Sequence, residues 1–364
     1  MPEFRYRSRI EASAEKVFDW HSRPGAFERL KPPWEKVEVV ERHGTIKDGD
    51  RIVIKTKIGP FAKQWEAVHC DYIEGRQFCD ILVKGPFAKW EHTHRFEPDG
   101  ASACYLEDEI RYDLPFGFLG NLLGKSFTIN KLNRMFAYRH QVTQQDLKMH
   151  NSREGVQSMK ILTTGGNGLI GSALAPFLRT GGHEVNNLTR NKDSKDCCDF
   201  HWNPHTEELD TESLEGVEAV VHLAGENIAQ RWTEERKSRI KESRAKGTQF
   251  LSESLAKLEN PPRVLVCASA IGYYGDRGDE VLKEDSPPGD SFLAEVCKEW
   301  EAATKPAVQK GIRVVNLRIG VVLSPEGGAL AKMLLPFKMG VGGVVGSGEQ
   351  YWSWIALDDL VGVI

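Results

Sequence analysis

The stretch KILTTGGNGLIG, residues 160–171, decides the fold of the second half of the chain. Lys160–Thr164 is typical of a short buried strand, and Leu169 begins an apolar pattern with helical spacing. Between them stand four glycines: Gly165, Gly166, Gly168 and Gly171. Glycine permits a tight turn and lets backbone N–H groups approach a pyrophosphate at the positive end of the helix. The stretch therefore predicts a dinucleotide-binding strand–turn–helix unit.

The residues after this unit support the prediction and indicate which dinucleotide binds. A second strand, Glu184–Thr189, begins one helix later, as a βαβ unit requires, so an ordinary glycine-rich turn is the weaker interpretation. An NAD site would place Asp or Glu at the end of that strand, but the sequence there is Thr189-Arg190-Asn191. A cation suits a ribose 2′-phosphate, so we predict NADP(H) in preference to NAD(H). The alternative is that Arg190 is a solvated surface residue.

Length and composition exclude several classes of protein. A chain of 364 residues is long enough for two domains, each with its own core. The net charge of −4 gives no basic excess for a nucleic-acid partner, and no apolar run has the length of a membrane span. The seven cysteines are odd in number and irregularly spaced, which indicates a reducing compartment. We predict a cytoplasmic protein with a small-molecule substrate and leave its oligomeric state open.

The first 150 residues show a different order of elements. A strand at Phe4–Ile10 precedes two short helices at Ala14–His21 and Pro24–Leu30. Strands are then expected at Val37–Val40, Arg51–Lys57, Trp65–Tyr72, Gln77–Val83, Trp90–Glu97 and Ala103–Tyr112, and a long helix at Phe118–Leu147. This order predicts an α+β domain over residues 1–150, followed by a linker over residues 151–158.

That order, together with two local phrases, resembles the START-like polyketide cyclase and lipid-binding superfamily, which has the helix-grip fold. The phrases are Ile10–Phe18 and Trp90–Phe96. The resemblance implies a curved sheet around the long helix, with an apolar cavity that takes a small hydrophobic or amphipathic ligand, and it supplies no catalytic set. His92 and His94 share one face of a strand. They are either part of a metal site, polar lining of the cavity, or an exposed or capped pair.

The second half continues as alternating strands and helices after residue 189. Strands are expected at Glu218–Leu223, Arg263–Ser269 and Arg313–Arg318, and helices at Thr233–Lys257 and near Phe292–Gln309. The alternation predicts a doubly wound parallel sheet of the Rossmann type. Loops at the carboxyl ends of its strands, Ala224–Trp232 and Ala270–Gly278, should rim the cofactor cleft.

Several motifs in this half resemble the NAD(P)-dependent epimerase-related family of atypical short-chain dehydrogenases. They include Thr164–Gly171, His222–Ala229, Ser243-Arg244, Ser269–Gly275 and Leu317–Gly320. The resemblance implies an extended short-chain dehydrogenase fold over residues 159–364. It implies cofactor contacts from Thr164, Gly165, Gly168, Leu169, Ile170, Gly171, Arg190, Leu223, Ala224, Gly225 and Ser269. Extended members usually continue beyond the region that ends here at Ile364, so we expect a domain truncated at its C-terminus.

The usual catalytic pair of that superfamily, Tyr-x-x-x-Lys, is not found. If Glu301 is aligned with the glutamate that commonly follows the lysine, Leu293 and Cys297 occupy the two positions. Ser269, Tyr273 and Tyr274 are the remaining catalytic candidates, with a structural role in the cleft as the alternative. Cys297 lacks an evident cationic neighbour that would make it a nucleophile. No metal is expected, because Cys197, Cys198, His201 and His205 match no standard zinc spacing within Asp193–His205, a segment with the composition of a polar loop.

Two hypotheses follow from the sequence. The first is an NADP(H)-dependent oxidoreductase or epimerase-like enzyme whose N-terminal domain binds an apolar small molecule. The second is a catalytically silent NADP(H)-binding module whose cofactor state is coupled to ligand binding in the START-like domain. The missing tyrosine–lysine pair favours the second hypothesis, and the glycine loop suits both.

Overall fold

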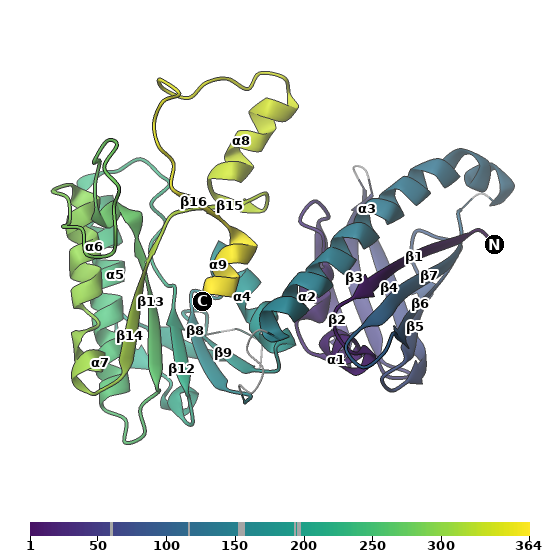
Figure 1. The fold of residues 1–364 in the computed structure, drawn as a ribbon, viewed down its shortest axis with the longest axis horizontal. Coiled ribbons are helices and arrows are strands. Elements are labelled where there is room, and N and C mark those ends of the chain that lie inside the picture. Colours follow the sequence, from purple (N-terminus) through teal and green to yellow (C-terminus); the bar gives the residue numbers. More distant parts are fainter. Residues whose placement is uncertain (59–60, 116, 152–156, 193, 195–197) are drawn as a thin grey trace. The chain divides into compact units, whose positions relative to one another are not determined.

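A computed structural model describes residues 1–58, 61–115, 117–151, 157–192, 194 and 198–364 (Figure 1). The chain divides into two compact units, Met1–Val156 with Arg179–Gly182, and Gln157–Leu178 with His183–Ile364. Most of the expected linker, residues 152–156, lies outside the described residues, and Asn151 is the last residue of a helix. No helix in the described ranges has both the length and the apolar character needed to cross a membrane.

The first unit is an antiparallel sheet with a long helix, which confirms the α+β prediction. Its sheet has the strand order β1-β7-β6-β5-β4-β3-β2. The strands are β1 (Glu3–Ile10), β2 (Val37–His43), β3 (Arg51–Ile58), β4 (Phe61–Ile73), β5 (Gln77–Lys84), β6 (Lys89–Pro98) and β7 (Cys104–Asp113). The helices are α1 (Ala14–Ser22), α2 (Ala26–Leu30) and α3 (Gly117–Asn151).

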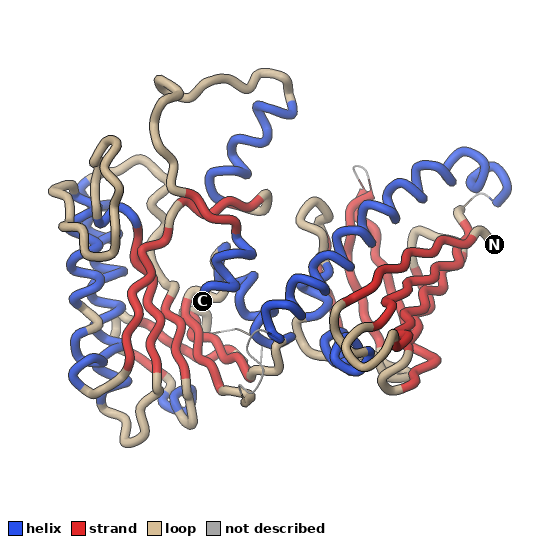
Figure 2. The backbone as a smooth tube through the Cα atoms, viewed as in Figure 1, coloured by secondary structure: helices blue, strands red, loops and turns tan. Residues whose placement is uncertain are grey.

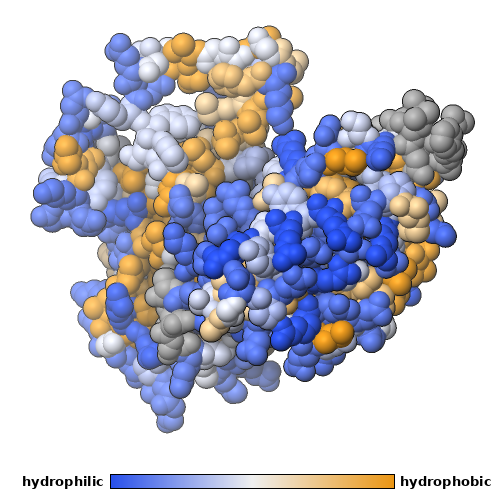
Figure 3. All heavy atoms as spheres, turned by 45° about the vertical axis from the view of Figure 1, so that its right-hand side comes forward, coloured by the Kyte–Doolittle hydropathy of each residue, from blue (hydrophilic) through white to orange (hydrophobic). Residues whose placement is uncertain are grey.

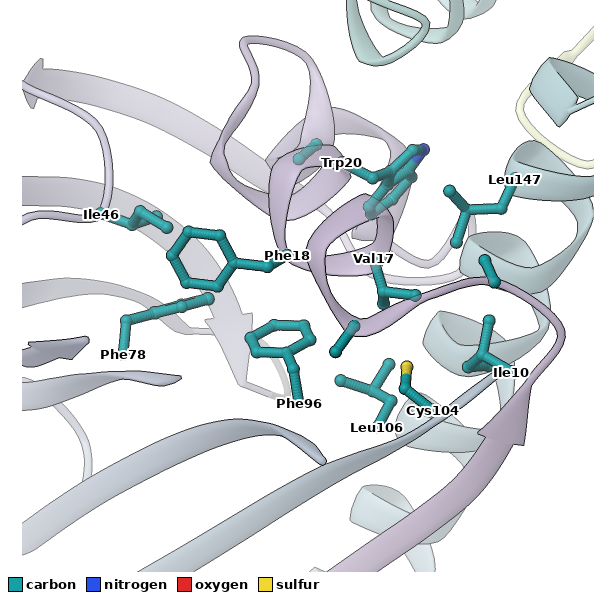
Figure 4. Packing of buried hydrophobic residues seen from close by; sticks show 13 residues of the cluster. Ile10, Val17, Phe18, Trp20, Ile46, Phe78, Phe96, Cys104, Leu106 and Leu147 are labelled. Atoms are coloured by element: carbon teal, nitrogen blue, oxygen red, sulfur yellow. The ribbon is translucent and has the colours of Figure 1, made fainter. Parts of the chain in front are cut away.

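Alternation along the strands builds the core of this unit. In β6, Trp90, His92, His94 and Phe96 are buried, whereas the residues between them are less so. Figure 4 shows Phe78, Phe96 and Leu106 from the sheet packed with Val17, Phe18 and Trp20 from α1, and Leu147 from α3. Ser13 caps α1 by accepting a hydrogen bond from the Lys16 N–H. The alternation therefore sends one face of the sheet toward the helices, and this face carries polar as well as apolar residues.

The other face of the same strands carries charges. Glu109 lies 2.6 Å from Arg95 and 2.7 Å from Arg111, and its side chain is only 4% exposed. Arg7 pairs with Glu97 at 2.7 Å. In the view of Figure 3, much of the surface of this unit is accordingly hydrophilic. The sheet is thus two-sided, with ion pairs outside and the core and cavity inside.

The second unit is the predicted doubly wound Rossmann sheet. Its strand order is β11-β10-β9-β8-β12-β13-β14. In this order, each strand from β10 onward is parallel to the next. The strands are β8 (Lys160–Thr164), β9 (Glu184–Thr189), β10 (Asp199–Asn203), β11 (Glu208–Leu209), β12 (Ala219–His222), β13 (Val264–Ala270) and β14 (Arg313–Ile319). The helices are α4 (Leu169–Thr180), α5 (Glu234–Ala256), α6 (Phe292–Ala302) and α7 (Lys305–Gln309). Figure 2 shows α5, α6 and α7 on one side of this sheet and α4 on the other.

Two sequence expectations are wrong within this unit. The segment expected as a polar loop, Asp193–His205, contains β10, because Trp202 is buried in the core and Asp199 pairs with Asn187 of β9. The helix expected over Phe292–Gln309 is broken into α6 and α7, with Pro306 in the first turn of α7. Proline favours a helix start and cannot continue an existing helix without losing a hydrogen bond.

The last segment forms a smaller parallel pair and two helices. It comprises β15 (Val321–Ser324), α8 (Gly328–Lys338), β16 (Trp354–Ala356) and α9 (Leu357–Val363). In Figure 1, α8 and the chain that follows it extend away from the parallel sheet of this unit. Several large apolar side chains here are exposed: Leu335, Phe337, Met339, Val341 and Tyr351.

Candidate functional site

The glycine loop between β8 and α4 has no room for side chains at Gly165 and Gly171. Gly165 has φ +73°, and a Cβ added to it would lie 2.9 Å from the Leu223 backbone. A Cβ on Gly171 would lie 2.4 Å from the Gly165 carbonyl oxygen. The first N–H groups of α4 lack partners within their own helix, so they are available to an anion in this turn. The loop thus fits the pyrophosphate of a dinucleotide.

Asn187 holds this loop in place, a role that the sequence analysis missed. Its Oδ1 accepts hydrogen bonds from the Gly166 N–H at 3.1 Å and from Thr163 Oγ1 at 3.4 Å. Its Nδ2 donates to Asp199 Oδ1 at 2.9 Å. The side chain therefore links the glycine loop to β9 and β10. The available signal was a pair of polar residues, Asn186-Asn187, inside a strand expected to be buried.

Thr164 acts through its neighbours, because it is fully buried and has no surface to offer a cofactor. Its hydroxyl accepts the N–H groups of Leu223 and Ala224, both at 3.1 Å, and lies 2.7 Å from His222 Nδ1. The Thr164 proton must then point to Nδ1, so His222 carries its own proton on Nε2 and donates it to Thr248 Oγ1 at 2.9 Å. Burial lowers the pKa of His222 to about 4 and keeps the ring neutral.

The loop that carries Leu223, Ala224 and Gly225 is clamped to α5. Arg244 Nη1 donates to the carbonyl oxygens of Glu226 at 3.0 Å and Ile240 at 3.2 Å. A Cβ on Gly225 would lie 3.2 Å from the Arg244 guanidinium carbon. Ser243 Oγ accepts the Glu226 N–H at 3.0 Å. These contacts explain why the Ser243-Arg244 motif accompanies the glycine loop in this sequence.

The other predicted cofactor contacts lie near the same loop. Leu169 and Ile170 open α4 and are half-buried. Gly327 approaches Leu169 so closely that an added Cβ would lie 3.2 Å from Leu169 Cδ1. Arg190 directly follows β9 and is exposed. The structure thus gathers the glycine loop and the Leu223–Gly225 loop at the carboxyl ends of β8 and β12.

The three catalytic candidates meet around Arg318, which the sequence analysis did not assign. Ser269 Oγ donates to Glu301 Oε1 at 2.7 Å, and Arg318 binds both Glu301 oxygens at 2.9 Å. Arg318 Nη1 also donates to the Tyr274 hydroxyl at 2.9 Å, and the guanidinium carbon lies 3.5 Å from the Tyr273 ring centroid. The hydrogen bond to Glu301 raises the pKa of Arg318. Ser269 and Tyr274 are buried, and Tyr273 is half-buried.

The positions of the usual tyrosine–lysine pair hold residues that serve packing. A Cβ on Gly272 would lie 3.2 Å from Leu293 Cβ, so α6 packs tightly on the turn after β13. The Cys297 thiol faces the Ala270 carbonyl oxygen at 3.7 Å. Burial raises the pKa of Cys297, so it stays a thiol near neutral pH. Neither residue supplies the proton transfer that the pair performs elsewhere.

The first unit contains a cavity of about 1190 Å³. Its apolar walls include Ile52, Ile54, Trp65, Phe78 and Leu132, from the sheet and from α3. Its polar lining includes His21, His69, Asp80, His92 and His94. His92 and His94 therefore line the cavity, which is one of the three alternatives given above. The alternative of an exposed pair is wrong, because the two side chains are only 4% and 8% exposed.

Three neighbouring strands and α3 bring these polar residues together. Asp80 of β5 pairs in register with His92 of β6, and His94 pairs with Asp108 of β7. Asp108 Oδ1 accepts from His92 Nε2 at 2.7 Å, and Asp108 Oδ2 lies 2.6 Å from His140 Nε2 of α3. Burial alone would lower the pKa of His92, but the carboxylates of Asp80 and Asp108 outweigh it and raise that pKa to about 9.

The zinc group considered around residue 200 receives no support from the described residues. His201 instead contacts Glu208 at 3.0 Å, and Cys197 lies outside the described ranges. Within the part of the chain that is described, metal-type side chains converge at Cys70, Asp71 and Cys79 and at Asp80, His92 and His94.

The chain belongs to the NAD dependent epimerase/dehydratase family, which matches residues 161–364. Residues 10–135 match the family described as polyketide cyclase / dehydrase and lipid transport. Both resemblances expected from the sequence are confirmed. The chain thus joins an NAD(P)-binding Rossmann domain to a lipid-binding-type domain.

Particular relatives support this assignment. An epimerase family protein of Mycobacterium bovis is 45% identical over 202 residues, which cover 55% of this chain and 66% of that protein. Human epimerase family protein SDR39U1 is 38% identical over 57% of this chain and 69% of its own length. The chain thus spans about two thirds of the length of these relatives.

Two solved structures are similar to this chain, one over nearly its whole length and one over about half of it. A crystal structure of a nucleoside-diphosphate sugar epimerase from Corynebacterium glutamicum is 33% identical, with TM-score 0.83, over 99% of this chain and 74% of that one. Human SDR39U1 (isoform 2), solved with NADPH, is 37% identical, with TM-score 0.51, over 56% of this chain and 68% of that one.

Proposed function

We propose that this chain is an NADP(H)-binding protein whose N-terminal domain takes a small apolar or amphipathic ligand. The observation that supports cofactor binding is the geometry of the glycine loop, where backbone atoms fill the space that a side chain would need at Gly165 and at Gly171. The observation that supports the ligand half is the cavity of about 1190 Å³ with mostly apolar walls.

The preference for NADP(H) rests on Arg190. This side chain is exposed directly after β9, the place where NAD-binding domains use a carboxylate for the ribose 2′-hydroxyl. A guanidinium there binds a 2′-phosphate by charge-assisted hydrogen bonds. The human relative solved with NADPH is consistent with this choice.

The groups expected to hold the cofactor are the loop backbone at Gly165, Gly168 and Gly171 together with the loop at Leu223–Gly225. Asn187, His222 and Arg244 position these loops through the hydrogen bonds described above. When bound, the nicotinamide supplies a hydride acceptor or donor. The tyrosine–lysine acid–base pair is replaced by Leu293 and Cys297, so cofactor binding without that chemistry is the function that the geometry supports best.

An oxidoreductase or epimerase-like activity is the second candidate, and Tyr273 is the observation that favours it. The buried hydroxyls of Ser269 and Tyr274 are hydrogen-bonded to Glu301 and Arg318. Tyr273 is half-buried and contacts the Arg318 guanidinium with the face of its ring. Its phenol is therefore the group best able to exchange a proton with a substrate.

Titration of the full chain with NADPH, followed by nucleotide fluorescence, tests cofactor binding. Gly168→Asp should weaken binding at least about 100-fold, because a Cβ there lies 3.2 Å from the Gly165 oxygen and the carboxylate repels phosphate. Gly343→Ala is the matched control, since it has open space around it. Absent wild-type binding, or equal binding by Gly168→Asp, would contradict the proposal.

A carbonyl panel with NADPH distinguishes the two candidates. Turnover by the wild type that is lost in Tyr273→Phe and retained in Tyr274→Phe would support the enzyme. Tight NADPH binding with no hydride transfer to any panel member would support the binding module.

A further inference from the structure

The histidines of the N-terminal cavity form an arrangement that neither the families nor the relatives assign. Asp80, His92 and His94 come from adjacent strands, line the cavity, and keep their ligand-type atoms within 4.8 Å of one another. His92 Nδ1 lies 3.2 Å from Asp80 Oδ1, and His94 Nε2 lies 3.7 Å from the same oxygen. Two nitrogens therefore face one carboxylate oxygen at the wall of a largely apolar cavity.

The opposite nitrogens of both rings lie close to a single carboxylate oxygen. His92 Nε2 lies 2.7 Å and His94 Nδ1 lies 2.8 Å from Asp108 Oδ1. Because a carboxylate only accepts, His92 carries a proton on Nε2, the nitrogen that faces Asp108. Asp108 is itself fixed from the other oxygen by His140 at 2.6 Å. This is the outer carboxylate that commonly orients histidine ligands of a metal and sets their tautomers.

The remaining ring nitrogens, His92 Nδ1 and His94 Nε2, both face Asp80 Oδ1. A proton on His92 Nδ1 or a metal ion shared by the three atoms can balance the charge of this carboxylate. The separations of 3.2 and 3.7 Å are longer than charge-assisted hydrogen bonds, which are about 2.7–2.9 Å. The 3.2 Å separation matches two donor atoms that are each about 2.1 Å from one ion, which stand about 3–3.5 Å apart, and the 3.7 Å separation is slightly longer than that range.

We propose that Asp80 Oδ1, His92 Nδ1 and His94 Nε2 bind one divalent transition-metal ion at the wall of the N-terminal cavity. Two imidazoles and one carboxylate suit Zn²⁺, Co²⁺ or Fe²⁺ and leave coordination positions open. Asp108 is the positioning residue for the His92 ring, and its Oδ1 also lies 2.8 Å from His94 Nδ1.

The consequence concerns the ligand of the cavity and rests on the proposed ligand-binding function. An open metal position beside apolar walls selects a molecule with an apolar body and one oxygen donor, such as a carboxylate, hydroxyl or keto oxygen. Metal binding is measured with the ion alone, so failure of the ligand proposal would leave the metal result standing.

The test titrates chelator-treated full-length chain with Co²⁺, recording visible absorption, and with Zn²⁺ by calorimetry. One ion per chain is expected, with tetrahedral or five-coordinate Co²⁺ absorption. Asp80→Asn and His94→Gln should weaken binding at least 100-fold, and Asp108→Asn should weaken it about 10–100-fold. His43→Gln is the matched control, because His43 is 66% exposed and pairs with Glu41 outside the cavity; its binding should equal that of the wild type.

Circular dichroism of the metal-free variants checks that they fold. If Asp80→Asn or His94→Gln unfolds, wild-type crystals soaked in Zn²⁺ decide the matter, and an anomalous peak between Asp80, His92 and His94 is expected. No stoichiometric binding, or no such peak, would mean that a proton on His92 occupies the site and would overturn the proposal. Strong thiolate charge-transfer absorption would also overturn it by assigning the ion to Cys70 and Cys79.

Discussion

At the scale of single residues, the second unit uses its motif side chains mainly to position the backbone. Hydrogen bonds from four side chains position the two loops of the candidate cofactor site: Thr164, Asn187, His222 and Arg244. Their hydrogen bonds are made within the protein, which leaves backbone N–H groups to face the ligand. This explains why a glycine loop here is accompanied by polar residues within buried strands.

The pair formed by Glu301 and Arg318 should stabilise this unit whether or not the chain is catalytic. Glu301→Ala leaves the partly buried Arg318 and Ser269 without their acceptor, so the free energy of unfolding should fall by about 2–4 kcal/mol. Urea unfolding measures the change. Glu235→Ala removes the exposed pair with Arg239 and should cost under about 0.5 kcal/mol; equal losses in the two variants would contradict this role.

His222 should make stability depend on pH in a definite direction. Burial lowers its folded-state pKa to about 4, below the ordinary value of 6.5, so the unfolded chain binds the proton more readily. Stability from this residue is complete above about pH 6.5 and falls by up to about 1.4 kcal/mol per pH unit between pH 6.5 and 4. In His222→Gln, the midpoint of thermal unfolding should depend less steeply on pH over this interval than in the wild type. In the control His205→Gln, this pH dependence should be unchanged. An unchanged slope in His222→Gln would count against the buried neutral ring.

At the scale of elements, the antiparallel sheet separates two kinds of polar residue by strand alternation. Glu107 and Glu109 face the arginines outside, whereas Asp108 between them faces the histidines inside. A one-residue shift in the register of β7 would exchange these faces. The cavity and its polar wall therefore depend on the register of β5, β6 and β7.

Filling the cavity from β4 should block its ligand without disturbing the ion pairs outside. Ala67 is 2% exposed and lines the cavity, so Ala67→Phe places a ring in that space. A fluorescent apolar probe should bind wild-type chain at one site, and the variant should bind it at least about 10-fold more weakly. Ala62→Phe, on the same strand at an exposed position, should bind normally. Equal probe affinity in all three proteins would show that the probe does not use this cavity.

At the scale of the whole molecule, the sequence predicts the two architectures better than it predicts the sites. Lys160–Thr164 and Glu184–Thr189 coincide with β8 and β9, because the glycine turn and the helix between the two strands leave few alternative positions for them. The strand β10 is missed because the charged residues around Cys198 conceal the short alternation that ends in buried Trp202.

The sites depend on contacts between distant residues, which no local pattern reveals. Asp80 joins His92 and His94 only through strand pairing, and Arg318 joins Ser269 and Tyr274 only when β13 and β14 lie side by side. The glycine loop is the exception, because strand, turn and helix are consecutive in sequence. Its local geometry is accordingly the part of the site that sequence reasoning predicts most fully.

The central claim is that the Rossmann domain binds NADP(H) with Arg190 at the 2′-phosphate. The decisive measurement is the dissociation constant of NADPH and of NADH for the wild type, Arg190→Ala and the control Arg239→Ala, whose side chain is 53% exposed on α5. We predict that the wild type and the control bind NADPH at least about 10-fold more tightly than NADH. Arg190→Ala should lose that preference while NADH affinity stays unchanged. Equal affinities in the wild type, or an undiminished preference in Arg190→Ala, would contradict the account.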